Sequence, residues 1–277
     1  MAGGSCDPRT QWRRPAVKLE DYKDKYGSIN ITRNDGVIEL AMHTKGGPPK
    51  WGTTGKSLHA DLPDAFLDVA RDPENRVVIL TGTGDSFITN FDMDDMSQEG
   101  QAKMWPRIYE EGVGLLNNLL AIPVPVIGAV NGPAFIHAEL LVLSDIVLAA
   151  EHAEFADFAH VPGRTVPGDG VHVIWPMLLG PNRGRYFLLT GERIAAEEAK
   201  QLGVVGEVLA ADGLLPRARE LATQLAQLPL PVLRYTRQVL VHDLRCRMMN
   251  GLGSGLAHEA LASVTAPAFM ESAEGER

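Results

Sequence analysis

Three short apolar runs, separated by segments of helical periodicity, limit the folds open to this chain. The runs cover residues 76–80, 124–130 and 144–150, and each has the length of a buried strand rather than of a helix. The first two end in turn residues, at Gly82 and at Asn131. Strands that alternate with helices favour an α/β fold with a mainly parallel sheet.

Hydrophobic spacing predicts the remaining elements. Residues 29–32 and 37–42 alternate around a turn of Asn, Asp and Gly, which indicates a β-hairpin. Residues 206–209 are interpreted as a last strand, and the pattern beyond Asp212 is helical almost throughout. The segments with helical spacing cover residues 58–70, 105–120, 134–143, 174–179, 183–189, 195–202, 213–227, 231–246 and 252–262.

These patterns divide the chain into three parts. Residues 1–17 are rich in Gly, Arg and Pro and lack an apolar segment, so we expect a disordered N-terminal arm rather than a signal peptide or membrane anchor. Residues 18–211 form the α/β core, and residues 212–277 form a C-terminal helical region. No apolar run is long enough to span a bilayer.

The charge balance argues against two classes of partner. With a formal net charge of −9 and no long basic run, the chain is not expected to bind nucleic acid or an anionic membrane. Cys6 and Cys246 lie far apart and lack metal-ligand spacing, which favours a reduced, cytoplasmic compartment.

A bent loop over residues 155–169 carries the strongest chemical signal. It holds His160 and Asp169, with two Pro-Gly pairs between them. Pro-Gly pairs do not fit inside a helix or a central strand, so the backbone must turn and can fold Asp169 back onto the imidazole. A histidine oriented by a carboxylate is the basic unit of general-base catalysis. From these residues alone, a histidine bonded to backbone and a helix-capping aspartate are the alternative.

Residues 130–145 place polar groups at another strand end. A helix is predicted to begin after Pro133, and the N–H groups of its first turn form an anion site. His137 and Glu139 lie in or close to that turn. A structural role for His137 and a helix-dipole role for Glu139 are the alternatives to participation in a site.

Several other chemistries lack their motifs. The glycines of residues 81–96 come without the lysine of a P-loop, and Ser86 lacks the second glycine of a nucleophile elbow. No HxxxH, HxH or CxxC spacing occurs, so no metal site is predicted. His172 and the pair His258-Glu259 lie on predicted helices and by themselves favour structural or solvated roles.

The chain resembles the crotonase (enoyl-CoA hydratase/isomerase) superfamily over about residues 27–265. The run IPVPVIGAVNGPAF, the later segments LVLSDIVLAAEHAEF and VPGDG, and the earlier segment GTGDSFITNFDM carry the resemblance. It implies a crotonase-like spiral of ββα units with a C-terminal helical region used in trimer packing. It also implies a homotrimer or a dimer of trimers.

Matching motif to motif places the family's functional groups on this sequence. The two backbone N–H groups that hold the reacting carbonyl oxygen fall at Phe91 and Ile136. The first catalytic glutamate of hydratases matches Glu139, but the second matches His160. The Gly-Gly-Gly run that precedes the first glutamate in hydratases is replaced by Phe-Ile-His. These departures argue against alkene hydration.

The departures resemble the carbon–carbon-bond hydrolases typified by 6-oxocamphor hydrolase, a β-diketone hydrolase. The matching positions are His137, His160, Asp169 and Glu259, with Trp51 in the first loop. The resemblance implies a small-molecule substrate that is a cyclic 1,3-diketone, with a bicyclic one expected first. A retro-Claisen reaction would hydrolyse it to a keto acid through an enolate, with no cofactor.

The implied roles divide between proton transfer and oxygen binding. His160 is the base that takes a proton from water, and Asp169 orients it. The oxyanion-hole N–H groups and His137 hold the ketone or enolate oxygen. Glu259 positions water or substrate, and the expected substrate-binding side chains are Trp51 and Glu139. The alternatives are a coenzyme-A-dependent hydratase or isomerase of the same superfamily and a catalytically silent oligomeric binding protein.

Overall fold

The computed structural model describes residues 17–97 and 99–265 of the chain. The predicted N-terminal arm, except for Val17, therefore lies outside the described residues, as does the end of the C-terminal region. Among the described helices, none combines the length and apolar character needed to cross a bilayer.

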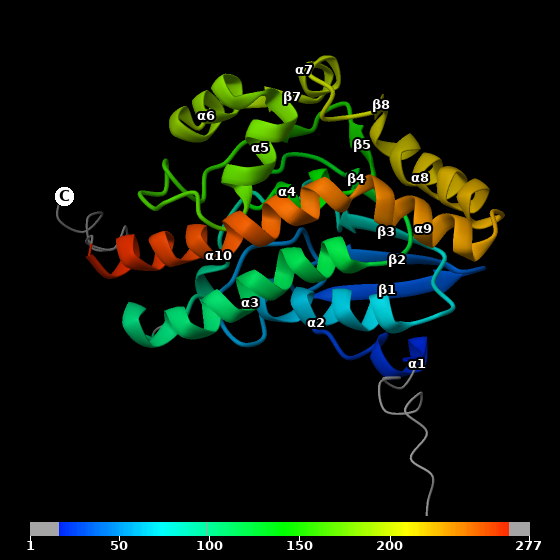
Figure 1. The fold of residues 1–277 in the computed structure, drawn as a ribbon, viewed down its shortest axis with the longest axis horizontal. Coiled ribbons are helices and arrows are strands. Elements are labelled where there is room, and N and C mark those ends of the chain that lie inside the picture. The colour runs from blue at the N-terminus through cyan, green and yellow to red at the C-terminus, as the bar shows by residue number, and fades with distance from the viewer. Residues whose placement is uncertain (1–16, 98, 266–277) are drawn as a thin grey trace, which may run out of the picture.

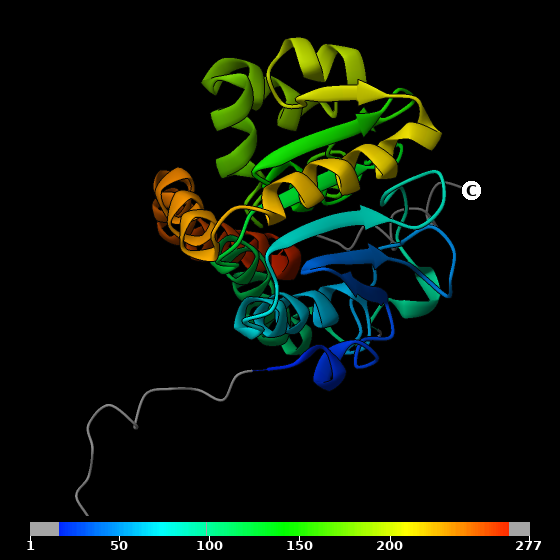
Figure 2. The ribbon, with the colours of Figure 1, turned by 90° about the vertical axis from the view of Figure 1, so that its right-hand side faces the viewer.

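A six-stranded sheet in the order β1-β2-β3-β4-β5-β8 forms the centre of the molecule (Figures 1 and 2). Only the pair β1–β2 is antiparallel, and every later pairing in this sheet is parallel. The predicted hairpin and the mainly parallel sheet are thus confirmed. The strands are β1 (Ile29–Asn34), β2 (Val37–Met42), β3 (Val77–Gly82), β4 (Val126–Val130), β5 (Ile146–Ala150) and β8 (Glu207–Leu209), and a separate pair joins β6 (Glu154–Phe155) to β7 (Ile194–Ala195).

Helices cover both faces of the sheet. Helix α8 (Ala211–Ala226) packs across β2 to β5 on one face, as Figure 2 shows, and the larger core lies between the other face and α2 and α3. Helix α10 runs beside α3 (Figure 1). The helices other than α8 are α1 (Leu19–Tyr22), α2 (Leu58–Arg71), the 3₁₀ turn η1 (Met93–Asp95), α3 (Gln101–Ala121), α4 (Glu139–Val142), α5 (Val171–Leu179), α6 (Pro181–Thr190), α7 (Ala196–Gln201), α9 (Leu230–Leu240) and α10 (His242–Thr265).

The continuous apolar runs of the sequence reflect a sheet that is buried on both sides. Along β3, Val78 and Leu80 belong to the larger core, whereas Val77 and Ile79 pack against the small side chains of α8. Because successive side chains of a strand point to opposite faces, a central parallel strand needs apolar residues at every position. The apolar run over residues 76–80 therefore indicates a strand even though apolar and polar residues do not alternate in it.

A buried arginine ties the C-terminal helices to the core. The Arg237 Nε atom lies 2.7 Å from Asp145 Oδ2, and its Nη atoms donate to the carbonyls of Leu119 and Leu120 at the end of α3. The last carbonyls of a helix lack their usual partners within the helix, so the guanidinium supplies a donor to Leu120 and a second one to Leu119, whose carbonyl also accepts from the Ile122 N–H. Asp145 in turn accepts from the N–H of Val126, at the start of β4.

The bounds of three predicted helices are corrected. The helix expected over 134–143 begins only at Glu139 and spans four residues, because the N–H groups of Phe135 and Ile136 both donate to the Ile88 carbonyl. The helices expected over 231–246 and 252–262 are instead divided at Val241, and α10 is continuous from His242 to Thr265.

A glycine in α10 has a packing role. A side chain at Gly255 would bring its Cβ to 2.1 Å from the carbonyl oxygen of Gly168, so the helix surface must be bare where the 166–168 turn lies on it. Tertiary contact therefore outweighs the low helix propensity of glycine.

Candidate active site

The candidate site is built from loops that follow the carboxyl ends of neighbouring strands. Trp51 follows β2, His137 and Glu139 follow β4, and His160 lies beyond β5 and β6. Because these strands run in one direction, their carboxyl ends share one edge of the sheet, where α/β proteins place their ligands. Residues far apart in sequence are thereby collected into one buried region.

The turn after β4 holds the loop after β3. The Asn131 side chain accepts from the Gly82 N–H at 3.1 Å and donates to the carbonyls of Gly84 and Ser86 at 3.0 and 2.8 Å. A Cβ at Gly132 would lie 1.9 Å from the Asp85 carbonyl oxygen, so only glycine allows this approach. The Asn-Gly pair that ended the predicted strand thus joins the two loops that carry the expected oxyanion donors.

Two imidazoles and three carboxylates alternate in one chain of contacts. His160 Nδ1 lies 2.7 Å from Asp157 Oδ1, and His160 Nε2 lies 3.3 Å from Asp169 Oδ2. The same Asp169 oxygen lies 3.0 Å from His137 Nδ1, which also contacts Glu139 Oε1 at 2.6 Å. The exposed fraction of each side chain in this chain is 12% or less. The structure therefore brings together four of the residues singled out from the sequence and adds Asp157.

The predicted bend in the 155–169 loop is what brings Asp169 inward. No helix or strand lies between β6 and α5, and Gly170, with φ +109°, turns the chain into α5. A Cβ at Gly168 would lie 2.3 Å from the Gly255 carbonyl oxygen and 3.0 Å from Glu259 Cβ. The glycine thus lets the turn lie against α10, next to Glu259.

The carboxylates set the charge state of both imidazoles. Burial acts to lower the pKa of His160, but Asp169 and Asp157 outweigh it and hold that pKa well above its ordinary value. Burial acts in the same way on His137, and Glu139 and Asp169 raise its pKa to about 10. The surrounding carboxylates therefore favour the protonated form of both rings.

The pKa values of the carboxyl groups in the site shift in opposite directions. Burial favours the neutral form of Asp169, but the two imidazoliums hold its pKa well below the usual range. For Glu139, burial outweighs the attraction of His137 and raises the pKa. Burial, reinforced by the charge of Asp169, raises the pKa of Glu259 to about 8. Carboxyl groups with opposite shifts in one site are typical of acid–base catalysis.

His137 adopts a backbone conformation that glycine would adopt more easily. Its φ is +52°, in the left-handed region. For a residue with a Cβ this conformation costs about 1–2 kcal/mol. The position falls in the segment where hydratases carry glycines, so the chain accepts strain there and gains an imidazole within the site.

The Trp51 ring lies between two histidines. Its centroid is 3.8 Å from that of His137 in a tilted stack and 5.5 Å from that of His59 in an edge-on contact. Trp51 is 3% exposed, so in this structure it forms part of the wall of the site. His59 Nδ1 lies 2.6 Å from Glu111 Oε2, and Arg107 Nη1 contacts the same carboxylate at 2.9 and 3.0 Å.

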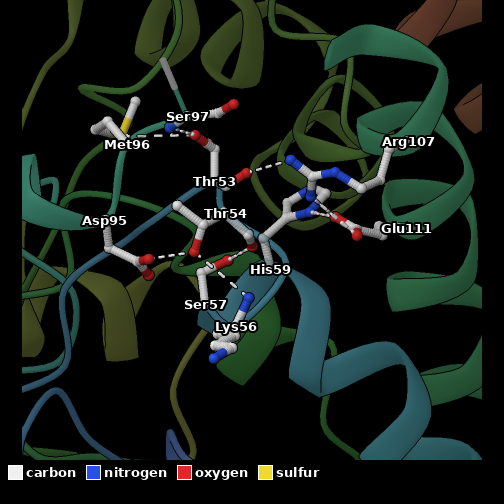
Figure 3. Close-up of polar contacts among 10 residues, drawn as sticks. All are labelled: Thr53, Thr54, Lys56, Ser57, His59, Asp95, Met96, Ser97, Arg107 and Glu111. Carbon is white, nitrogen blue, oxygen red and sulfur yellow. Dashed lines mark hydrogen bonds and ion pairs between the residues drawn. The ribbon is translucent and has the colours of Figure 1, made fainter. Parts of the chain in front are cut away.

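Polar contacts fix the loop between Trp51 and α2, as Figure 3 shows. Arg107 donates to the Thr53 carbonyl at 2.5 Å, and Thr53 Oγ1 accepts from the N–H of Ser97 at 2.9 Å. The Thr54 hydroxyl donates to the Asp95 carboxylate. These contacts join the first loop to the loop after β3 and to α3, and so hold the Trp51 ring in place.

The two predicted oxyanion donors differ in whether their N–H groups already donate a hydrogen bond. Trp51 and Phe91 form a backbone bridge, and within the described residues the Phe91 N–H donates to no acceptor. The Ile136 N–H, by contrast, donates to the Ile88 carbonyl at 2.9 Å. A ligand oxygen bound there has to share or displace that bond. The oxyanion role of both residues stays a prediction.

His137, Glu139 and Asp169 are a group of described residues whose ligating atoms all lie within 4.8 Å of one another. Two ligands of a tetrahedral zinc ion, each about 2.0–2.2 Å from the metal, are about 3.3–3.6 Å apart. The N–O distances of 2.6 and 3.0 Å around His137 Nδ1 are shorter than this; the contact with Glu139 is a hydrogen bond, and the contact with Asp169 is an ion pair. As arranged, the trio is a cluster of one imidazole and two carboxyl groups in direct contact.

Sequence reasoning missed Asp157 and the pair His59–Glu111. Asp157 precedes His160 by three residues in the same loop, and that spacing was a usable signal. His59 and Glu111 lie on different helices, α2 and α3, and no local pattern links them. Glu259, assigned from the resemblance, has a buried Oε2 atom with no hydrogen-bond partner in the described structure, while its neighbour His258 is exposed.

Taken together, the fold and the site define an α/β enzyme with a buried acid–base centre at the carboxyl edge of its sheet. The chain belongs to the enoyl-CoA hydratase/isomerase family, whose model matches residues 32–257. This confirms the resemblance to the crotonase superfamily and its fold.

Known relatives differ in their activities. The chain is 44% identical to a solved β-diketone hydrolase from Anabaena sp. PCC 7120 bound to (S)-3-oxocyclohexyl acetic acid, with a TM-score of 0.84, covering 88% of this chain and 97% of that one. An enoyl-CoA hydratase/isomerase structure from Mycobacterium paratuberculosis is 25% identical, with a TM-score of 0.81 over 91% and 99% of the two chains. Carnitinyl-CoA dehydratase from Salmonella arizonae is 35% identical over 72% of this chain and 75% of its own length.

Proposed function

We propose that the protein is a β-diketone hydrolase that cleaves a carbon–carbon bond of a cyclic 1,3-diketone to give a keto acid. The observation that carries the proposal is the buried chain of contacts from Asp157 through His160, Asp169 and His137 to Glu139. The 44% identity to a β-diketone hydrolase over most of both chains supports it.

The first step is attack of water on one ketone. The neutral form of His160 takes a proton from water at Nε2 while the water oxygen bonds to the carbonyl carbon. Asp169, 3.3 Å from Nε2, stabilises the imidazolium that results. The negative charge that forms on the ketone oxygen needs donors placed beforehand, and one such donor contributes about 3–4 kcal/mol to catalysis. The Phe91 N–H, with Ile136 and His137, is assigned to this task.

The second step breaks the carbon–carbon bond. The tetrahedral intermediate collapses to a carboxylic acid, and the electron pair of the broken bond forms the enolate of the other ketone. A proton from the imidazolium then returns to the enolate carbon, so the sum is diketone plus water to keto acid. The imidazolium of His137, whose pKa is raised to about 10, is a suitable stabiliser for the enolate oxygen.

The remaining assignments follow from position. Glu259 has a buried carboxyl with a pKa of about 8 beside the Asp169 turn, and it positions water or substrate. Trp51 provides an apolar wall for the ring of the diketone. Glu139 sits behind His137 and fixes that imidazole, so its effect on substrate binding passes through His137.

A coenzyme-A-dependent reaction is the second candidate. The family match and the 35% identity to carnitinyl-CoA dehydratase favour it. A surface cavity of about 250 Å³ is lined by Lys45, Lys50 and Lys56, which suit a phosphate-rich ligand, although three aspartates share the same cavity. The imidazole of His160 in place of the hydratases' second glutamate speaks against alkene hydration.

One assay separates the candidates. The protein is incubated with a panel of symmetric bicyclic 1,3-diketones, and the products are resolved by chiral chromatography, while acyl-CoA esters are tested by thermal shift and turnover. We expect a keto acid from at least one diketone and no acyl-CoA turnover. Turnover of an enoyl-CoA or carnitinyl-CoA ester without diketone cleavage contradicts the proposal.

We also propose a homotrimer or a dimer of trimers, as the resemblance implies. Helices α9 and α10 carry exposed apolar side chains, among them Val239 at 76% and Met249 at 68% exposure. Exposed apolar groups concentrated on neighbouring helices favour a protein interface. Sedimentation velocity tests the oligomeric state, and a monomer at micromolar concentration contradicts the proposal.

A further inference from the structure

Two carboxylates contact the ring of His160, one at each nitrogen. Asp157 Oδ1 lies 2.7 Å from Nδ1, and Asp169 Oδ2 lies 3.3 Å from Nε2. The side chains of Asp157 and His160 are each only 2% exposed. The orienting contact that the sequence assigned to Asp169 is thus matched by a shorter contact from a residue with no assigned role.

The backbone around Asp157 is held on both sides. The Ala156 N–H donates to the Ala134 carbonyl at 3.1 Å, and the Phe158 N–H donates to the Phe135 carbonyl at 2.8 Å. Asp157 is therefore anchored to the segment that leads into His137, so the two halves of the contact chain share one support. These bonds fix the backbone on either side of Asp157, and a carboxylate on a fixed backbone can set the orientation of the ring beside it.

A neutral imidazole carries one proton, and its location decides whether Nε2 can act as a base. A proton on Nδ1 leaves the Nε2 lone pair facing Asp169 and the water, whereas a proton on Nε2 removes that lone pair. We propose that Asp157 is the positioning residue of the site, which holds the His160 proton on Nδ1 and leaves Nε2 to take the proton from water. The catalytic consequence rests on the proposed hydrolase function, but the proton location does not.

The proposal separates the tasks of the two aspartates. Asp157 fixes the tautomer and the orientation of the ring, while Asp169 stabilises the imidazolium and links it to His137. An amide at position 157 can donate to Nδ1, which favours the tautomer with the proton on Nε2, opposite Asp169. An amide at position 169 leaves the contact between Asp157 and Nδ1–H intact.

The first measurement is the ¹H–¹⁵N spectrum of ¹⁵N-histidine-labelled protein without substrate, recorded above the pH at which His160 becomes neutral, with His160 assigned by loss of its signals in His160→Gln. We expect its most deshielded ring proton to lie on Nδ1, because that contact is the shorter and stronger one. That proton should persist in Asp169→Asn and be lost in Asp157→Asn. A most deshielded proton on Nε2, or one that survives Asp157→Asn, overturns the proposal.

The second measurement is kinetic, on a diketone that the parent protein cleaves. Asp157→Asn should lower kcat by ~10²–10⁴-fold with little change in KM, as expected for a wrong tautomer, while Asp157→Glu should recover part of the loss. Circular dichroism checks that each variant is folded. Parent-like kcat in folded Asp157→Asn overturns the proposal. If the parent protein cleaves no diketone, the proposed function fails, and the NMR result alone decides the role of Asp157.

Discussion

Two buried histidine–carboxylate clusters flank the Trp51 ring, and they hold their imidazoles in opposite states. His137 stacks on one side of the ring, and His59 meets its edge. Burial by itself acts to lower the pKa of both histidines. With all neighbouring charges included, the pKa of His137 is raised to about 10, whereas that of His59 is lowered.

The two rings differ in how many carboxylates face them and in whether an arginine also pairs with those carboxylates. His137 faces both Glu139 and Asp169, and among the described residues neither carboxylate pairs with an arginine or lysine. His59 faces Glu111 alone, and that carboxylate also binds Arg107 at 2.9 Å. One carboxylate that also pairs with an arginine does not offset the desolvation of an imidazolium, whereas two carboxylates without an arginine or lysine partner do, although His160 also contacts Asp169. Proximity to a carboxylate is therefore not enough to identify a catalytic histidine.

The largest expected effect comes from breaking the chemical cluster. His160→Ala and Asp169→Asn should fold normally and lose diketone turnover by ~10²-fold or more, because general-base assistance is lost. His258→Ala serves as control, since this ring is exposed and its hydrogen bond within the described residues goes to the Ser254 carbonyl of its own helix. Steady-state rates and circular dichroism check the prediction, and parent-like rates in both site variants contradict it.

The next effect is on the pH dependence of turnover. Asp169 and Asp157 hold the pKa of His160 well above its ordinary value, and only the neutral ring is a base. The ratio kcat/KM should therefore rise as pH increases from neutral toward alkaline. In Asp169→Asn the lost charge lowers the pKa of His160, so the rising limb should move to lower pH while its plateau falls. A profile that decreases from neutral to alkaline pH is inconsistent with a His160 base.

A smaller effect is expected at the second cluster. Arg107 lowers the pKa of His59, so Arg107→Met should raise it, whereas Glu111→Gln removes the favourable charge and should lower it further. NMR titration of the histidine side chains measures both shifts, with His160 as the internal reference. Shifts of the same sign in the two variants are incompatible with charge sharing by Arg107.

The smallest effect concerns the ring that separates the clusters. Burial of one CH₂ group is worth about 0.8 kcal/mol, so Trp51→Ala should raise KM by ~4-fold for each substrate CH₂ that the ring covers. Trp51→Phe keeps an aromatic face against His137 and should lie closer to the parent. Equal KM values for all three proteins in the diketone assay mean that Trp51 is not part of the binding wall.

Much of the fold follows from local pattern. The strands β3, β4 and β5 are apolar at consecutive positions, and the runs of β3 and β4 end in turn residues, so both their type and their parallel arrangement were predictable. The α4 region was not, because the N–H groups of residues 135 and 136 bond to Ile88 in another loop. Propensity describes local preference, and here long-range hydrogen bonds decide the outcome.

Some features of the site also follow from local sequence, whereas others depend on the fold. The Pro-Gly pairs predict the bend that brings Asp169 to His160, and Gly168 allows the turn to lie against α10. The contact between Asp169 and His137 joins two separate loops, and the pair His59–Glu111 joins two helices. No spacing along the chain encodes such distances, so only the fold shows which imidazoles share a carboxylate.

The central claim is that a histidine-activated water cleaves a carbon–carbon bond between two carbonyls. Its most direct test is single-turnover cleavage of a symmetric bicyclic 1,3-diketone in H₂¹⁸O, with mass analysis of the product. The account predicts a keto acid that carries solvent oxygen in its carboxylate, formed by the parent protein and lost in His160→Ala. Recovery of intact diketone from the parent protein, or a labelled acid formed equally fast by His160→Ala, contradicts it.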